Sequence, residues 1–221
     1  MTAPNVAEAG VCLNYGAAWD APPDWLNLDA SPVILFERLP LVGRLYTKNK
    51  TRFPDNVYYG DIVKGLKLAD ASADLAFSSH VLEHLAREEA EVAVAETFRV
   101  LRPGGLFRVI VPDLESAVRR YVHDLDNGVS DANDQLLRRI ILGRERRQRG
   151  LASVLRLMFS NVSHQWMWDA PSLTALLTRH GFVDIRQATF GDSIDPRFLS
   201  VEREARFFEA VALEARKPQG A

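Results

Sequence analysis

The sequence has a single cysteine, Cys12, among its 221 residues. One thiol excludes an internal disulfide and any metal site made of clustered cysteines. The sequence also lacks a run of 18 or more apolar residues that could span a bilayer, and MTAPNVAEAGVCL at the N-terminus has neither the basic start nor the apolar stretch of a secretory signal. We therefore expect a cytoplasmic protein with no membrane span.

An excess of charge of either sign is missing as well. The formal net charge is −2, from 27 basic and 29 acidic residues, so no overall field attracts nucleic acid. The 47% of hydrophobic and 25% of charged residues are ordinary for a folded soluble protein and argue against disorder. The length fits one domain, residues 1–221.

Short apolar runs that end in polar or small residues predict the strands of a mostly parallel sheet. A helix over residues 80–101 separates the fourth and fifth strands, with Ala90, Val94, Phe98 and Leu101 on one face and a stop at Pro103–Gly105. We expect strands at residues 11–15, 25–29, 57–62, 73–78, 106–112, 182–190 and 207–217.

The segment 114–163 is mainly helical in pattern, with breaks at 126–130 and 143–150, and is longer than a simple crossover. We expect it to be a helical insertion or lid between the fifth and sixth strands. Another helix follows at 169–181, where Asp169 and Pro171 mark the start and Gly181 the C-terminal cap.

Strands that alternate with helices predict an α/β fold, a Rossmann-like sheet covered by helices on both faces. Ligands in such sheets bind at the carboxyl ends of the strands. Polar or small residues follow four of the expected strands, so we expect them at one edge: Gly16, Asp29, Asp61 and Ser78–His80.

The turn after the first strand, in LNYGAAWDAPPDWLNLD, has only one glycine. A glycine there lets the backbone approach a ligand, and Asp29 at the end of the second strand can accept hydrogen bonds from the two hydroxyls of a ribose. The crossover from Ala17 to Asp24 is too short for a helix, so the phosphate-binding helix N-terminus is missing. That absence argues against a nicotinamide-dependent oxidoreductase.

Longer motifs extend this interpretation. The runs SSHVLEHL and ETFRVLRPGGLFRVIVPD resemble the class I S-adenosylmethionine-dependent methyltransferases, in the type 11 branch whose opening motif is LNLGCG followed by GWINVD. HQWMWDAPSLTALLTRHGFVDIR resembles the C-terminal part of the same family. Ala17 replaces the cysteine and Ala18 the second glycine of the opening motif, while six positions match: Leu13, Asn14, Gly16, Trp25, Asn27 and Asp29.

The resemblance implies a seven-stranded methyltransferase sheet with an antiparallel last strand, and S-adenosylmethionine as the cofactor. It places Gly16 under the methionine part, Asp29 on the ribose and Asp61 near the adenine amino group. If Ala18 has a positive φ, the strain costs about 1 kcal/mol. The cofactor-binding residues expected from this resemblance are Asn14, Gly16, Ala18, Asp29, Asp61, Ser78 and Ser79.

Three residues are candidates for catalysis. His80 follows the fourth strand and can act as a base near neutral pH, although capping the next helix or bonding the loop is an equal alternative. Asp113 and His164 are expected to border the acceptor pocket. For Glu83 and His84 we expect structural pairing and no metal site, because the sequence offers neither a nearby cysteine nor a ligand on a second helix.

The stretch RRIILGRERRQRG is rich in arginine. It could bind an acidic acceptor or RNA. A solvated helix face or a homodimer contact is the preferred alternative, because the rest of the chain is not basic. The arginines are Arg138, Arg139, Arg144, Arg146, Arg147 and Arg149.

The leading hypothesis is a methyltransferase that acts on a small-molecule or carbohydrate-like acceptor. The alternative is a methyltransferase-like protein that does not bind the cofactor and works as a binding or assembly module. Ala17 and Ala18 motivate that alternative, because they replace motif residues in the cofactor turn.

Overall fold

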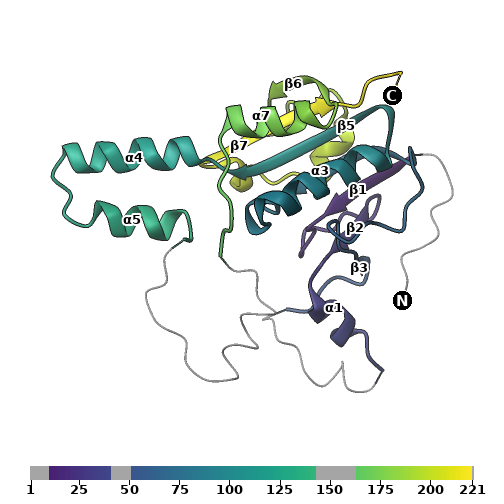
Figure 1. The fold of residues 1–221 in the computed structure, drawn as a ribbon. Helices are drawn as coiled ribbons and strands as arrows, with labels where there is room; N and C mark the ends of the chain where they lie inside the picture. Colours follow the sequence, from purple (N-terminus) through teal and green to yellow (C-terminus); the bar gives the residue numbers. More distant parts are fainter. Residues whose placement is uncertain (1–9, 41–50, 143–162, 221) are drawn as a thin grey trace.

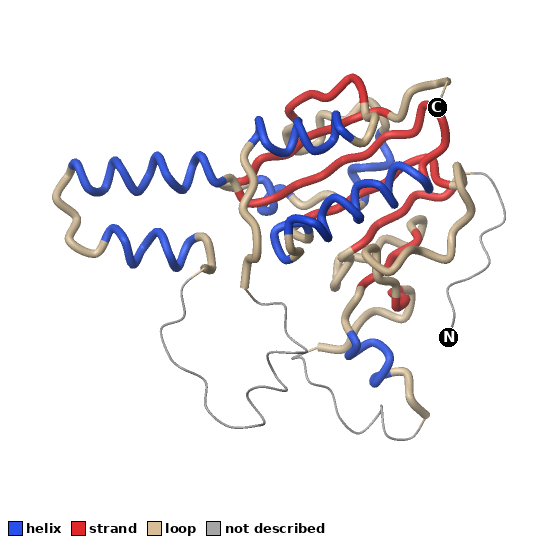
Figure 2. Tube along the Cα trace, in the orientation of Figure 1, coloured by secondary structure: helices blue, strands red, loops and turns tan. Residues whose placement is uncertain are grey.

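The computed structural model describes residues 10–40, 51–142 and 163–220, and it contains a seven-stranded sheet of order β3-β2-β1-β4-β5-β7-β6 (Figures 1 and 2). Strand β7 runs antiparallel to both β5 and β6, and the other neighbours are parallel. The sequence-based prediction of the sheet is therefore confirmed. The strands are β1 (Val11–Tyr15), β2 (Leu26–Asp29), β3 (Val57–Tyr59), β4 (Ala73–Ser79), β5 (Leu101–Pro112), β6 (Val183–Gln187) and β7 (Ala210–Arg216).

Strands β1 and β2 are parallel neighbours joined by a loop with no helix, as expected. Two buried asparagines hold this crossover. The side-chain amide of Asn14 donates to the backbone oxygen of Asp20 and to Oδ1 of Asn27, both at 2.9 Å. The amide of Asn27 donates to the backbone oxygens of Pro22 and Trp25, also at 2.9 Å. These four bonds fix the crossover loop in place without a helix.

Replacing Asn27 with alanine should therefore lower the free energy of unfolding by about 2–3 kcal/mol, because it leaves buried polar groups in the crossover without partners. Chemical denaturation of the wild type and of Asn27→Ala measures the difference. Asn56→Ala is the matched control, since the partly exposed amide of Asn56 donates one hydrogen bond within the described part of the chain, to the backbone oxygen of Ala21. If Asn27→Ala lowers the free energy of unfolding by less than about 0.5 kcal/mol, as a typical surface substitution does, Asn27 does not hold the crossover.

One face of the sheet is covered by α3 (Arg87–Val100) and α7 (Ala170–Arg179) (Figure 1). The predicted start of the first of these helices at His80 is wrong. Residues Leu82–His84 form a separate 3-10 helix, η1, and Leu85 and Ala86 are extended. The backbone nitrogen of Ala86 donates to Oε2 of Glu89 at 2.9 Å, which fixes the helix start.

The other face is covered by the crossover and by two 3-10 helices, η2 (Pro196–Ser200) and η3 (Glu204–Phe207). Phe198 and Trp25 pack there against Phe77 of β4. The sequence pattern predicts no element for residues 191–206, where η2 and the start of η3 lie. It also does not predict the short helix α1 (Pro32–Glu37) after β2.

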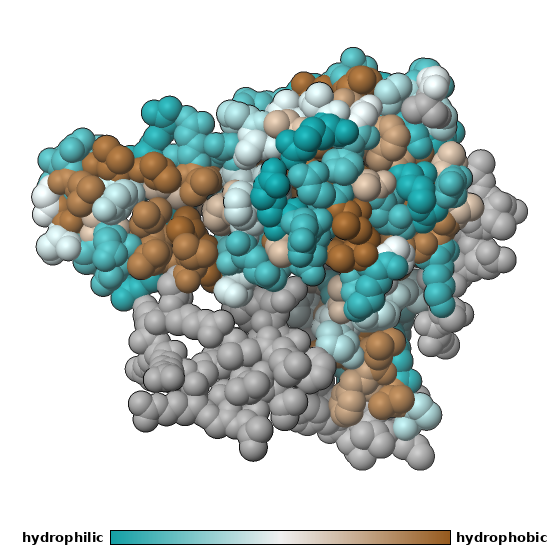
Figure 3. Space-filling model, viewed as in Figure 1, coloured by the Kyte–Doolittle hydropathy of each residue, from teal (hydrophilic) through white to brown (hydrophobic). Residues whose placement is uncertain are grey.

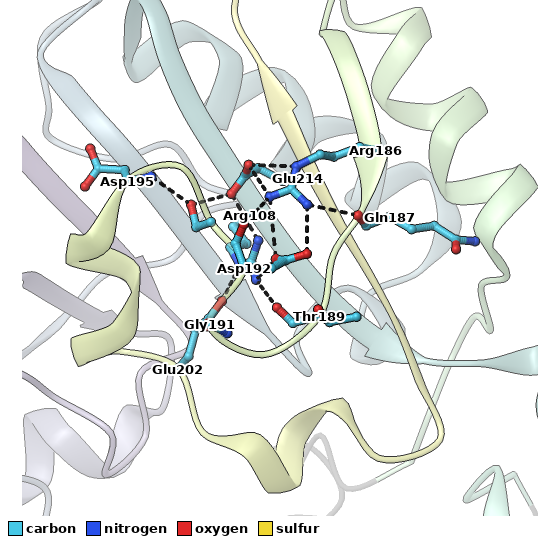
Figure 4. A network of polar contacts seen from close by, with 10 residues as sticks. Arg108, Arg186, Gln187, Thr189, Gly191, Asp192, Asp195, Glu202 and Glu214 are labelled. Carbon is cyan, nitrogen blue, oxygen red and sulfur yellow. Dashed lines mark hydrogen bonds and ion pairs between the residues drawn. The ribbon is translucent and has the colours of Figure 1, made fainter.

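A buried arginine fixes this second cover to the sheet (Figure 4). Arg108 of β5 is fully buried, and its guanidinium donates to Glu202, to Oε2 of Glu214 at 3.0 Å and to Oδ1 of Asp192 at 2.9 Å. Burial alone would raise the pKa of Asp192, but hydrogen bonds from Arg186 and Arg108 hold it well below its usual value. The network joins β5 and β7 to the segment that carries η2 and η3.

Helices α4 (Leu114–Asp126) and α5 (Ala132–Arg139) form a hairpin that projects from the sheet (Figure 1). They occupy the first part of the segment expected to be a helical insertion, and the break at 126–130 is present between them. Residues 143–162, with the second expected break, lie outside the described part. Apolar side chains are exposed on the hairpin (Figure 3): Val118, Val122, Leu125, Leu137, Ile141 and Leu142.

Candidate functional site

A cleft of about 720 Å³ opens at the carboxyl ends of β1, β2, β3 and β4, and we call it the main cleft. The topology explains its place, because the parallel strands end at one edge of the sheet. Six of the residues predicted as site residues line it: Gly16, Ala18, Asp29, Asp61, Ser79 and His80.

The turn after β1 forms without the second glycine of the family motif. Gly16 has φ +73°, and a Cβ added there would lie 2.1 Å from Cγ2 of Val81, so both backbone conformation and close packing require glycine. Ala18 has φ +46°, the positive value considered from the sequence, and its backbone nitrogen donates to Oδ2 of Asp29 at 3.0 Å. The turn is thus strained at Ala18 and held by the carboxylate.

Asp29 links the turn to the chain that follows β2. Its Oδ1 accepts a hydrogen bond from the backbone nitrogen of Ser31 at 2.8 Å, while Oδ2 accepts from Ala18. Each carboxylate oxygen has two lone pairs, so each can accept a second bond from a ligand. Burial raises the pKa of Asp29, and the bonds from Ser31 and Ala18 oppose that rise.

Two other predicted residues do not reach the main cleft. Asn14 is buried and engaged with the crossover, as described above, and borders only a small neighbouring cavity. Ser78 is fully buried. The hydroxyl of Ser79, in contrast, is buried beside the cleft with no hydrogen-bond partner among the described residues, so a polar ligand group would satisfy it.

The wall after β3 contains Tyr59, Asp61 and Ile62. Oδ1 of Asp61 accepts from the backbone nitrogen of Val63 at 3.1 Å, and Oδ2 pairs with Nζ of Lys64 at 2.6 Å. The carboxylate is therefore fixed at the cleft and can accept a further bond from an amino group.

Arg206 is a cleft residue that the sequence did not reveal. It lies on η3, and its Nη2 is 3.8 Å from Oδ2 of Asp20 in the crossover. Its backbone oxygen lies 3.1 Å from Nε2 of His80. Arg206 therefore brings a cation to the side of the cleft formed by Gly16, where an anionic ligand group would meet it.

A second, smaller pocket of about 220 Å³ lies beside the main cleft, and we call it the side pocket. Its walls come from the end of β5, from the α4–α5 hairpin and from the segment before β7. Asp113 and His164, which the sequence predicts to border an acceptor pocket, line this space, and so does His80. His80 is therefore common to the two spaces.

His80 has a constrained geometry. Its φ is +55°, its backbone nitrogen donates to the oxygen of Ile110 at 2.9 Å, and its Nδ1 lies 3.3 Å from Oε1 of Glu83. Both ring nitrogens face acceptors, the Glu83 carboxylate and the backbone oxygen of Arg206. A neutral imidazole has only one N–H, so it can donate to one of them and leaves the other nitrogen as a proton acceptor.

Asp113, His164 and the two tryptophans of the HQWMWD run also lie in this region. Oδ1 of Asp113 accepts from the backbone nitrogen of Glu115 at 3.0 Å and so caps α4. Burial lowers the pKa of His164. Trp168 is buried in the core. The Cζ atom of Arg87 lies over the ring of Trp166, 5.7 Å from the ring centre.

The arginine-rich stretch is only partly described. Arg139, at the end of α5, pairs with Glu209 and lines the side pocket. Arg144, Arg146, Arg147 and Arg149 lie outside the described residues. Among the described helices, none is both long and apolar enough to cross a bilayer.

Known proteins resemble parts of this chain. Residues 37–109 match the family model described as a methyltransferase domain. A probable S-adenosylmethionine-dependent methyltransferase of Mycolicibacterium smegmatis is 42% identical over 65 residues, which are 29% of this chain and 24% of that protein. The alignment thus spans about a quarter of the relative's length.

Solved structures resemble the chain over most of its length. A putative methyltransferase of Haloferax volcanii, in complex with the Trm112 activator, is 17% identical with a TM-score of 0.47, over 95% of this chain and 82% of that chain. A possible histamine N-methyltransferase of Thermotoga maritima is 18% identical, with the same TM-score and coverages. The sequence match to a methyltransferase domain thus covers residues 37–109, less than half of the chain.

Proposed function

We propose that this chain transfers a methyl group from S-adenosylmethionine to a small-molecule or carbohydrate-like acceptor. The observation that carries the proposal is the position of His80, which lines both the main cleft and the side pocket. A cofactor in the first space and an acceptor in the second would meet at this residue.

The residues of the main cleft fit the cofactor. Asp29 offers acceptors for the ribose hydroxyls, and Asp61 offers one for the adenine amino group. The unpartnered hydroxyl of Ser79 and the cation of Arg206 suit the polar methionine end. The missing crossover helix is no obstacle, because S-adenosylmethionine has no phosphate.

The bound cofactor would supply an electrophilic methyl group on a sulfonium. An oxygen or nitrogen lone pair of the acceptor would take this methyl group, and the electrons of the carbon–sulfur bond would stay on sulfur. His80 accepts the proton that the acceptor loses. Alignment of the two reactants by the adjoining spaces supplies much of the remaining acceleration.

The side pocket favours a compact polar acceptor. Its volume of about 220 Å³ is below the roughly 300–1,000 Å³ of a drug-sized site. Asp113, Arg139 and Glu209 place charges of both signs on its walls. Hydroxyl or amine groups of a small metabolite or a sugar would find both donors and acceptors there.

Calorimetric titration with S-adenosylmethionine and S-adenosylhomocysteine tests the proposal. We expect one site per chain for each ligand, with a rise in the unfolding midpoint that follows ligand concentration. No heat and no stabilisation at millimolar ligand would sink the enzyme hypothesis and favour the binding module. The cytoplasmic location and the homodimer contact, both expected from the sequence, are not addressed by this titration and stay predictions.

Ala18 provides a separate test of the turn. Because the turn is already formed and held by Asp29, Ala18→Gly should leave the affinity for S-adenosylmethionine within about threefold of wild type, while relieving up to about 1 kcal/mol of backbone strain. Titration and thermal unfolding measure the two effects. A gain of tenfold or more in affinity would instead show that the alanine methyl group obstructs the cofactor.

A further inference from the structure

Three potential metal ligands meet where η1 approaches the chain before α7. Glu83, His84 and His164 each offer one ligand atom, and these atoms lie within 4.8 Å of one another. His84 lines the main cleft and His164 lines the side pocket. The rings of the two histidines are 5.1 Å apart and nearly perpendicular.

Glu83 is the acidic member of the cluster, and its carboxylate is buried. Its side chain is 1% exposed, and neither carboxylate oxygen forms a hydrogen bond among the described residues. Nδ1 of His80 and Nε2 of His84 lie 3.3 Å and 4.0 Å from Oε1. A buried carboxylate is costly unless a positive charge or hydrogen bonds compensate it, so this site calls for a cation.

Backbone hydrogen bonds hold the two chain segments together. The backbone oxygen of Glu83 accepts from the nitrogens of Gln165 at 2.7 Å and Trp166 at 3.2 Å. The side-chain amide of Gln165 donates to the backbone oxygen of His84 at 2.7 Å. These hydrogen bonds hold the backbone of the segment that carries Glu83 and His84 against the segment that follows His164, so the fold itself keeps the three side chains close together.

We propose that Glu83, His84 and His164 bind one divalent transition-metal ion. Two imidazoles and one carboxylate suit manganese, iron or zinc, whereas magnesium and calcium prefer oxygen ligands. Ligands bound at about 2.0–2.2 Å lie roughly 3–4 Å apart, so small side-chain rotations would close this set around an ion.

The place of the site gives the ion a function, in a step that rests on the proposed methyl transfer. An ion between the main cleft and the side pocket can bind an acceptor hydroxyl and lower the pKa of that hydroxyl. It would also orient the acceptor oxygen. The methyl acceptor would then be a molecule with a hydroxyl group that can coordinate the metal ion.

The test uses the full chain after dialysis against a chelator. Mn²⁺ is titrated and followed by electron paramagnetic resonance, and Zn²⁺ is titrated by calorimetry. We expect one ion per chain. Glu83→Gln and His164→Asn should each weaken the metal affinity by more than about 100-fold, because losing a residue that only supports a metal ligand already costs roughly 10–100-fold. His123→Ala is the matched control, because His123 is an exposed histidine of α4 outside the cluster.

S-adenosylhomocysteine titrations of the same samples separate this proposal from the proposed function. Binding of S-adenosylhomocysteine without Mn²⁺ or Zn²⁺ binding by the wild type overturns the metal site alone. Binding of metal without S-adenosylhomocysteine overturns the cofactor assignment alone. Equal metal affinity in wild type and in Glu83→Gln, with both proteins folded by circular dichroism, also overturns the metal site.

Discussion

Replacing Asp29 with alanine should weaken the binding of S-adenosylmethionine by about 100-fold. The carboxylate faces the main cleft with one remaining lone pair on each oxygen, which suits the two ribose hydroxyls. Hydrogen bonds to a charged group contribute about 1.5–3 kcal/mol each, and 100-fold corresponds to about 2.7 kcal/mol. Two such hydrogen bonds together contribute more than the free energy that a roughly 100-fold loss of affinity requires.

The same substitution removes the acceptor for Ala18 and Ser31, so folding must be measured beside binding. Asp24→Ala is the matched control, because Asp24 is an exposed acid of the same crossover outside the cleft. Asp29→Asn, which keeps the side-chain shape, should still lose at least about tenfold in affinity, because the amide supplies fewer acceptors. Wild-type affinity in folded Asp29→Ala would exclude the carboxylate as the ribose ligand.

The cleft could be predicted from the sequence because its parts are encoded locally. Apolar runs that end in Gly16, Asp29, Asp61 and Ser79 predict strands and their polar ends. Parallel strand order then places those ends at one edge, where the structure has the main cleft. Neither step needs information about distant residues.

The remaining features depend on contacts between distant parts of the chain. His164 lies 80 residues after His84, so no local spacing could reveal their shared cluster. Arg206 reaches the cleft from a segment with little helical or strand periodicity. The start of α3 was misplaced for another reason: the apolar spacing continues through Leu82, but Leu85 and Ala86 adopt extended backbone.

The buried position of Arg108 supports the second large prediction. Arg108→Met should lower the free energy of unfolding by about 3–5 kcal/mol, because three acidic side chains lose their buried cationic partner. Chemical denaturation measures this loss. Arg186→Met is the matched control: Arg186 pairs with two of the same acids but is 37% exposed, so we expect a loss of about 1 kcal/mol or less.

The network also links stability to the cleft. Glu202 and Asp192 belong to the segment that continues into η3, so releasing them from Arg108 should loosen the position of Arg206. We expect Arg108→Met, at a temperature where it stays folded, to bind S-adenosylmethionine about tenfold more weakly, a change of about 1.4 kcal/mol.

Arg206→Gln should give a similar loss of affinity with a stability change within about 0.5 kcal/mol, because its side chain is 44% exposed. Unchanged affinity in both variants would mean that the cation on η3 does not hold the cofactor, and that the network serves the fold alone.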